Sequence, residues 1–260
     1  MPNILVLAGE EDRGAVAVAQ ALATAGRLGV TLVQPAALAL ARWRQHIGAS
    51  GRVQTQLMLA DGRCFKDSDI AVVFNRLRYL SVPQFTRSSA RDREYAAQEF
   101  QALVGSWLHG IGCPIVNEGQ ARAIGWQRSL TQWLALAASC GLPVLPATRG
   151  TRAHVMPPAG SACTTLEALP ATALIDLLVL GGMCHGPLAT QYGEACSALA
   201  RRSGCALLAC TFGLVAGTYV LAAVNPYPSL LDLPSVTAVA GYLETLARKG
   251  TRYDPLFRSA

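Results

Sequence analysis

The first 120 residues alternate short apolar runs with longer stretches of helical spacing. Continuous apolar runs at residues 3–8, 30–33 and 70–74 are typical of strands that are buried on both faces of a sheet. Residues 15–24 have the small apolar side chains of a packed helix, and residues 36–44 carry leucines and a tryptophan at helical spacing. The order strand, helix, strand, helix predicts a parallel sheet with helices on its faces.

A hairpin and a long helix are predicted within the same region. Residues 53–59 alternate apolar and polar side chains, an Asp-Gly pair supplies the turn, and residues 63–65 return as the second strand. Residues 89–109 carry an apolar stripe of helical period behind a serine cap. Residues 113–116 form a short strand that ends at Asn117, after which we place a domain boundary.

The second half of the chain predicts a smaller α+β domain. Residues 148–168, rich in Gly, Pro, Ser and Thr, are its least structured part. The expected elements are a helix at 129–139, an extended stretch at 142–146, a strand at 174–180, a helix at 191–202, a hairpin of 205–210 with 218–224, and a closing helix at 235–248. The fold class is α/β, with a parallel α/β domain at residues 1–120 and an α+β domain at residues 121–260.

Composition narrows the class of protein. Apolar residues make up 52% of the 260 and charged residues 15%, which excludes global disorder. The net charge of +6 comes almost entirely from arginines, which are scattered without aromatic platforms, so we expect no nucleic-acid partner. No apolar run reaches the roughly 20 residues that span a bilayer, and the N-terminus lacks a basic export signal. We expect no membrane association, a cytoplasmic location and reduced cysteines.

The order of segments resembles that of a known enzyme family. A strand ending in Asn75-Arg76 precedes SARDREYAAQEF, CPIVN and GLPVLPAT, and the second half contains LLVLGGMCHGPL and AAVNPYPSL. This order resembles the ATP-grasp carboxylate–amine ligases, in particular the glutamate-ligase-like and peptide-modifying branch. The resemblance implies a pre-ATP-grasp domain followed by a reduced ATP-grasp-like domain. It also implies a ligase that forms an acyl phosphate with Mg-ATP and passes it to an amine.

The chain departs from that family where Mg-ATP would bind. The resemblance places the magnesium ligands at Thr211, Ala223 and Asn225, and only the asparagine is kept. The arginine expected on the preceding strand falls near Leu177, and no lysine lies between GLPVLPAT and LLVLGG. Hard cations need oxygen ligands with negative charge. We therefore expect a degenerate member without the lysine-bearing lobe, with no catalytic residue, no metal and no cofactor.

Five residues are candidates for ligand binding: Asn75, Arg76, Asn117, Asn225 and Tyr227. The first three end predicted strands of the parallel sheet, the edge at which open α/β sheets bind ligands. Arg76 fits either a pocket or a surface salt bridge, and Tyr227 fits either a docking residue or a cover for the core.

Other polar motifs receive structural interpretations. Residues 9–14, GEEDRG, read as an ordinary strand-to-helix turn because their acidic side chains would repel phosphate. Cys184-His185 and the cysteines that follow lack the close ligand pairs of a zinc site, and we interpret their thiols as buried and inert. His109 with Cys113 could suggest a Cys/His nucleophile pair, but His109 ends a predicted helix and Cys113 begins a buried strand, so we expect no catalysis there.

Three functions follow from this pattern. The first is an accessory or binding subunit for a protein, a peptide or a small carboxylate in a biosynthetic or peptide-modification pathway. The second is an active ATP-dependent carboxylate–amine ligase, with ATP and Mg bound at a non-standard or shared site. The third is a small-molecule-binding regulatory subunit. We expect a homodimer or a complex with a dedicated enzyme, because loss of a lobe would uncover apolar surface near residues 225–228.

Overall fold

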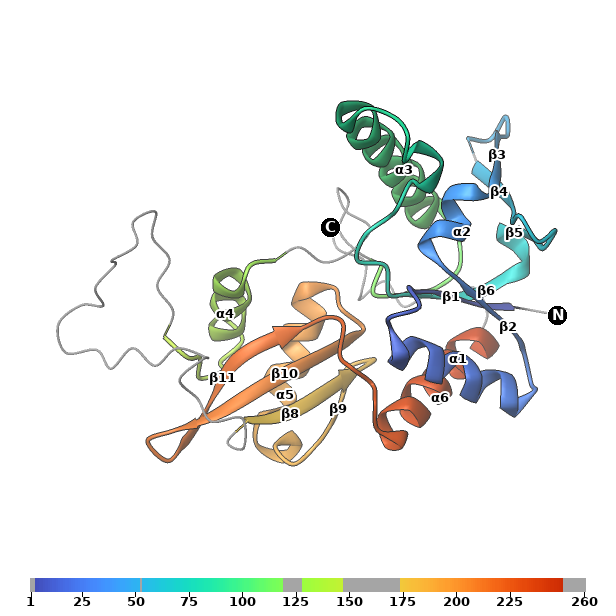
Figure 1. Cartoon of the computed structure of the whole chain (residues 1–260). Helices are drawn as coiled ribbons and strands as arrows, with labels where there is room; N and C mark the ends of the chain where they lie inside the picture. The colour runs from blue at the N-terminus through green and yellow to red at the C-terminus, as the bar shows by residue number, and fades with distance from the viewer. Residues whose placement is uncertain (1–2, 52, 119–127, 147–173, 250–260) are drawn as a thin grey trace. The chain divides into compact units, whose positions relative to one another are not determined.

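The structure is a computed structural model (Figure 1). It describes residues 3–51, 53–118, 128–146 and 174–249. The expected loop at 148–168, together with any lysine-bearing lobe between the flanking strands, lies outside these residues. Among the described residues no helix is both long and apolar enough to cross a bilayer.

The chain divides into two compact units. Met1–Gln127 and Ser229–Pro255 make up the first unit, and Arg128–Pro228 with Leu256–Ala260 make up the second. The chain therefore returns to the first unit at Ser229. This differs from the division expected from the sequence, in which residues 121–260 were continuous. The physical reason is the closing helix, which packs against the first helix of the chain.

A parallel sheet forms the centre of the first unit. Its strand order is β2-β1-β6-β7, and every neighbouring pair is parallel. The strands are β1 (Asn3–Leu7), β2 (Gly29–Val33), β6 (Ile70–Asn75) and β7 (Ile115–Val116). Helices α1 (Arg13–Ala25), α3 (Ala90–Gly110) and α6 (Leu233–Lys249) complete the unit, and α1 packs on α6. The α/β fold class with a parallel N-terminal sheet is confirmed.

The expected helix at 36–44 is wrong in its second half. Helix α2 (Pro35–Leu40) ends early, and β3 (Arg42–Ile47) follows. It pairs with β4 (Val53–Met58), and β4 pairs with β5 (Cys64–Lys66), so the expected hairpin is a three-stranded sheet. Ring packing of Trp43 explains the change, because its ring contacts Phe100 and Trp107 edge-on, with ring centroids 6.3 and 5.3 Å apart. Tertiary packing overrides the local helical spacing here.

The second unit is an antiparallel sheet with helices. The strand order is β11-β10-β8-β9. Its elements are α4 (Leu130–Ala138), β8 (Leu174–Leu180), β9 (Met183–His185), α5 (Ala189–Ser203), β10 (Leu207–Val215) and β11 (Thr218–Asn225). The expected hairpin of β10 with β11 is present and antiparallel. Tyr192 of α5 stacks on Phe212 of β10, with ring centroids 4.9 Å apart, which fixes the helix to its side of the sheet.

Candidate ligand site

The structure brings three predicted residues together at the carboxyl edge of the parallel sheet. Asn75 ends β6 and is fully buried, and its side-chain amide donates a hydrogen bond to the backbone oxygen of Asn117 (3.0 Å). Its own side-chain oxygen accepts from the backbone N–H of Leu77 (3.1 Å). Asn117 has a φ of 60°, a left-handed conformation that asparagine tolerates better than most residues. The two asparagines thus fix the chain where β6 and β7 end.

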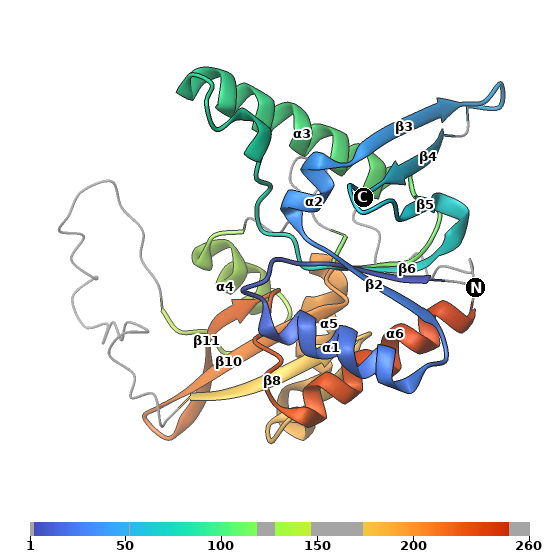
Figure 2. The same ribbon diagram turned by 45° about the vertical axis from the view of Figure 1, so that its right-hand side comes forward.

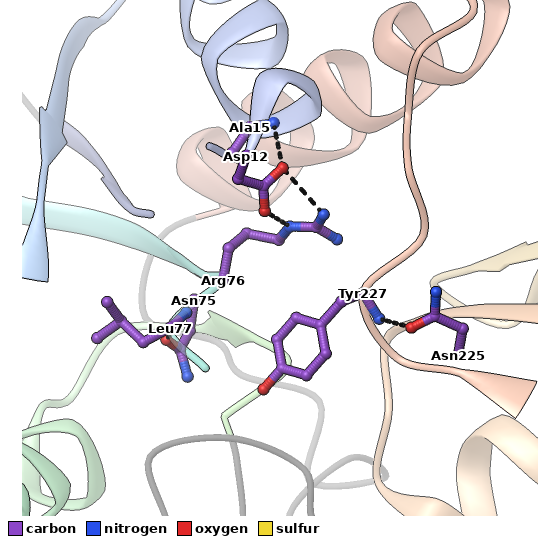
Figure 3. A network of polar contacts seen from close by, with 7 residues as sticks. All are labelled: Asp12, Ala15, Asn75, Arg76, Leu77, Asn225 and Tyr227. Atoms are coloured by element: carbon purple, nitrogen blue, oxygen red, sulfur yellow. Dashed lines mark hydrogen bonds and ion pairs between the residues drawn. The ribbon is translucent and has the colours of Figure 1, made fainter. Parts of the chain in front are cut away.

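Arg76 forms a buried ion pair and not the surface salt bridge that the sequence allowed. Its Nε lies 2.8 Å from Oδ2 of Asp12, and its Nη2 lies 3.1 Å from Oδ1 (Figure 3). The arginine side chain is 1% exposed and the aspartate 11%. Asp12 also caps α1, because Oδ1 accepts from the backbone N–H of Ala15 at 3.0 Å. The turn at residues 9–14 therefore caps α1 through Asp12, which also joins the helix to the sheet through Arg76. This agrees with an ordinary strand-to-helix turn better than with a phosphate-binding loop.

The acidic neighbours of Asp12 also have partners. Glu10 accepts from Gln34 at 2.8 Å, and Glu11 accepts from the Tyr79 hydroxyl at 3.1 Å, a bond that raises the pKa of Tyr79. A hollow of about 210 Å³ lies beside this cluster. Its lining includes Arg78 and Ser229, and it contains both acidic and basic side chains. The hollow is small, which limits a ligand here to one or two polar groups.

The sheet of the second unit has one face more open than the other. On the covered face Leu177 and Cys210 are fully buried, whereas on the open face Asp176 is exposed and Thr211 is partly exposed. Asp176 and Thr211 are cross-strand partners, and the threonine hydroxyl donates to Oδ1 of the aspartate at 2.6 Å. Thr211 is also the cross-strand partner of Ala223. A bulge follows Thr211 and changes the register beyond it.

The remaining two candidates end this sheet. Asn225 is exposed at the end of β11, and its side-chain oxygen accepts from the backbone N–H of Tyr227 at 2.8 Å. Figure 3 shows this turn. Tyr227 is 8% exposed, which agrees with a covering role better than with a docking role. The Asn-Pro-Tyr-Pro segment is therefore a turn held by its own asparagine.

No family model and no curated protein matches the sequence. Solved structures do match, across nearly the whole chain. The macrocyclase MdnB from Microcystis aeruginosa MRC gives a TM-score of 0.69 at 15% identity, covering 94% of this chain and 99% of MdnB. MdnC from the same organism, bound with precursor peptide MdnA, gives 0.70 at 11% identity, covering 94% and 99%. The ATP-grasp ligase PsnB, complexed with a phosphomimetic variant of its minimal precursor, Mg and ADP, gives 0.67 at 16%, covering 94% and 97%.

The chain has the ATP-grasp fold. The match extends from end to end of the ligases, so the segment order that the sequence suggested is confirmed at the level of fold. Identities of 11–16% carry no further than the fold.

The three positions that the resemblance to ATP-grasp ligases assigns to magnesium, Thr211, Ala223 and Asn225, can be compared with these contacts. Thr211 uses its hydroxyl hydrogen on Asp176, Ala223 has no oxygen in its side chain, and the Asn225 oxygen accepts from Tyr227. Among the described residues no group of three His, Cys, Asp or Glu side chains could hold a metal ion. One carboxylate remains on this face, which is less charge than protein magnesium sites commonly provide. The described side chains at these three positions therefore do not fit the ion.

The thiols considered from the sequence have structural surroundings. The seven cysteines in the described part of the chain are free thiols. Burial raises the pKa of Cys184, whose thiol donates to the backbone oxygen of Gly193 at 3.1 Å. Burial raises the pKa of Cys113 to about 12, and the nearby His109 instead lies 3.6 Å from Glu118. A buried thiol with a raised pKa forms little thiolate and is a poor nucleophile.

Sequence reasoning missed two carboxylates. Asp12 directly precedes a helix, and that position is an N-cap signal that could have revealed its role. Its pairing with Arg76 spans 64 positions and has no local signal. Asp176 is the single charged residue in the otherwise apolar strand LIDLLVL. This isolated charge could have indicated that Asp176 lies on the open face of the sheet.

Proposed function

We propose that this chain is an accessory or binding subunit that has lost Mg-ATP-dependent ligase chemistry and binds a peptide or another carboxylate-bearing partner. One observation carries the proposal. The positions that the resemblance assigns to two magnesium ligands, Thr211 and Ala223, are cross-strand partners, and the Thr211 hydroxyl is already donated to Asp176. A methyl group and a hydrogen-bonded hydroxyl bring no negative charge to a divalent cation.

The distribution of lysines also supports the loss of ATP binding. Lys66 and Lys249 are the only lysines in the chain, and both belong to the first unit. No lysine is therefore present in the second unit to neutralise a triphosphate. The likeness to MdnC and PsnB, whose structures hold precursor peptides, favours a peptide as the partner. A second copy of this chain or a dedicated enzyme completes the proposed assembly.

The alternative is an active ligase with a non-standard site. Two observations favour it: the match covers the PsnB chain almost completely, and Asp176 offers one carboxylate beside the metal position. In that case Asp176 would replace the missing aspartate from the neighbouring strand.

ADP formation separates the two functions. The purified chain, incubated with Mg-ATP and an acidic peptide, is expected to release ADP only at the background rate. The reason is that the second unit has neither carboxylates at Thr211 and Ala223 to hold magnesium nor a lysine to neutralise the triphosphate. The same rate is expected for Asp176→Asn. Release of ADP above background that Asp176→Asn abolishes would contradict the proposal and establish the alternative.

A further inference from the structure

A large hollow in the described part of the chain lies in the first unit, at the three-stranded sheet. It measures about 740 Å³, within the range of sites that bind small ligands or short peptide segments. One wall is β4 from Val53 to Gln56, and another is the segment Lys66-Asp67-Ser68. Gly110 and Gly112, at the end of α3, form part of the rim.

The hollow exists because β5 is shorter than β4. Strand β3 pairs with β4 along all six residues, from Val53 to Met58, and Figure 2 shows these two strands side by side. Strand β5 pairs only with Gln56, Leu57 and Met58. On the β5 side, the first half of β4 therefore has no neighbouring strand among the described residues.

One backbone group on this edge already binds a carboxylate. The N–H of Thr55 donates to Oδ2 of Asp67 at 2.6 Å, at the point where the β5 ladder has ended. Backbone groups in a strand alternate in direction with a period of two residues. Val53 therefore directs its N–H and C=O toward the same side as Thr55, into the hollow that both residues line.

The lining carries more positive than negative charge. Arg44 and Lys66 are exposed and line the hollow together with His46. The one lining carboxylate, Asp67, is engaged through both oxygens, because Oδ1 accepts from the indole N–H of Trp107 at 3.0 Å. The two cations keep long flexible side chains at the entrance, where they attract anionic groups from solution.

We propose that this hollow binds an acidic peptide segment, which lies extended beside β4, pairs with the backbone N–H and C=O of Val53, and places its carboxylates at Arg44 and Lys66. Strand addition uses main-chain hydrogen bonds for affinity and alternate side chains for specificity. The proposal assigns a site and a ligand class to the binding role proposed above, and it rests on that role only for the partner being a peptide. It holds equally for an active ligase.

The probe is a fluorescein-labelled eight-residue peptide that alternates Glu with Thr, with blocked ends. Fluorescence anisotropy at low salt is expected to give saturable binding at least tenfold tighter than for the same peptide with Lys in place of Glu. N-methylation of alternate backbone amides, which removes the ladder donors, is expected to weaken binding at least tenfold. Free glutamate and inorganic phosphate at equal concentration are expected not to displace the probe.

Two variants block the hollow, and each has a matched control. A Cβ built on Gly112 meets nothing within 4 Å, so Gly112→Leu starts in open space and adds an apolar side chain to the lining of the hollow. A Cβ on Gly105 also meets nothing within 4 Å, but Gly105 does not line the hollow, so Gly105→Leu is the matched control. The charge reversal Arg44→Glu/Lys66→Glu is compared with Arg87→Glu/Arg91→Glu, whose exposed side chains do not line the hollow. Hollow variants are expected to lose at least tenfold in affinity, and the controls less than threefold.

Equal binding of the Glu and Lys peptides overturns the proposal, as does equal loss in variants and controls. Displacement by free glutamate or phosphate, with no effect of N-methylation, shows a simple anion site and also overturns strand addition. Mg-ATP binding is measured separately on the same preparations. Absence of peptide binding would contradict the peptide site alone, whereas tight Mg-ATP binding would contradict the proposed loss of ligase chemistry alone.

Discussion

Asp12→Ala is expected to lower the free energy of unfolding of the first unit by about 3–5 kcal/mol. The change leaves the guanidinium of Arg76, with a side chain only 1% exposed, without its two charge-assisted bonds, and it removes the cap of α1. Urea unfolding followed by tryptophan fluorescence measures this change, because Trp107 lies in the core of this unit and Trp43 packs against it.

The pair variant shows where that loss comes from. Asp12→Ala combined with Arg76→Met removes the buried charge as well, and at least half of the lost stability is expected to return. Asp61→Ala breaks the exposed pair with Arg63 and serves as the control, with an expected unfolding midpoint equal to that of the wild type. A loss in Asp12→Ala no larger than in Asp61→Ala would show that the ion pair does not hold the carboxyl edge together.

Thr211→Asp combined with Ala223→Glu is expected to tighten the binding of Mn²⁺ to the second unit at least tenfold. The two positions are cross-strand partners, so the new carboxylates lie on one face within about 5 Å at Cβ. Asp176 is already beside the first of them, which makes three carboxylates available to a hard cation. Electron paramagnetic resonance of free Mn²⁺ gives the dissociation constant directly.

The control adds the same charge elsewhere in the same hairpin. Val215→Asp/Thr218→Glu also places two carboxylates on a cross-strand pair, at the turn end, away from Asp176. Its Mn²⁺ affinity is expected to stay within threefold of the wild type. Equal gains in both double variants would mean that added charge alone attracts the ion, and that the Thr211 position has no special geometry.

The sequence predicted the elements whose signal is local. The buried strand at residues 70–74 and the helix at 89–109 appear within one residue of their expected ends, because a continuous apolar run and a capped amphipathic stripe each determine their own structure. The prediction of helix at residues 42–44 was wrong, because Trp43 packs against Trp107 and this contact joins distant parts of the chain. The return of α6 to the first unit depends on packing against α1, and it has no local signal either.

The candidate site divides in the same way. Asn75, Arg76 and Asn117 were predicted as strand ends, and the parallel register brings the two asparagines into contact. The partner of Arg76 could not be predicted, because residues 12 and 76 meet only through the folded sheet. The absence of acidic residues at Thr211 and Ala223 was visible in the sequence. The hydrogen bond that links Thr211 to Asp176 required the register of β8 with β10.

Titration of the wild-type chain with Mg-ATP in a calorimeter tests the central claim most directly. With Thr211 and Ala223 where the resemblance expects metal-binding carboxylates, and no lysine in the second unit, the dissociation constant is expected to exceed about 1 mM, a binding free energy less favourable than about −4 kcal/mol. Thr211→Ala, which removes a hydroxyl without adding charge, should give the same result. A micromolar dissociation constant, about −8 kcal/mol, would contradict the account and identify the chain as a nucleotide-binding ligase.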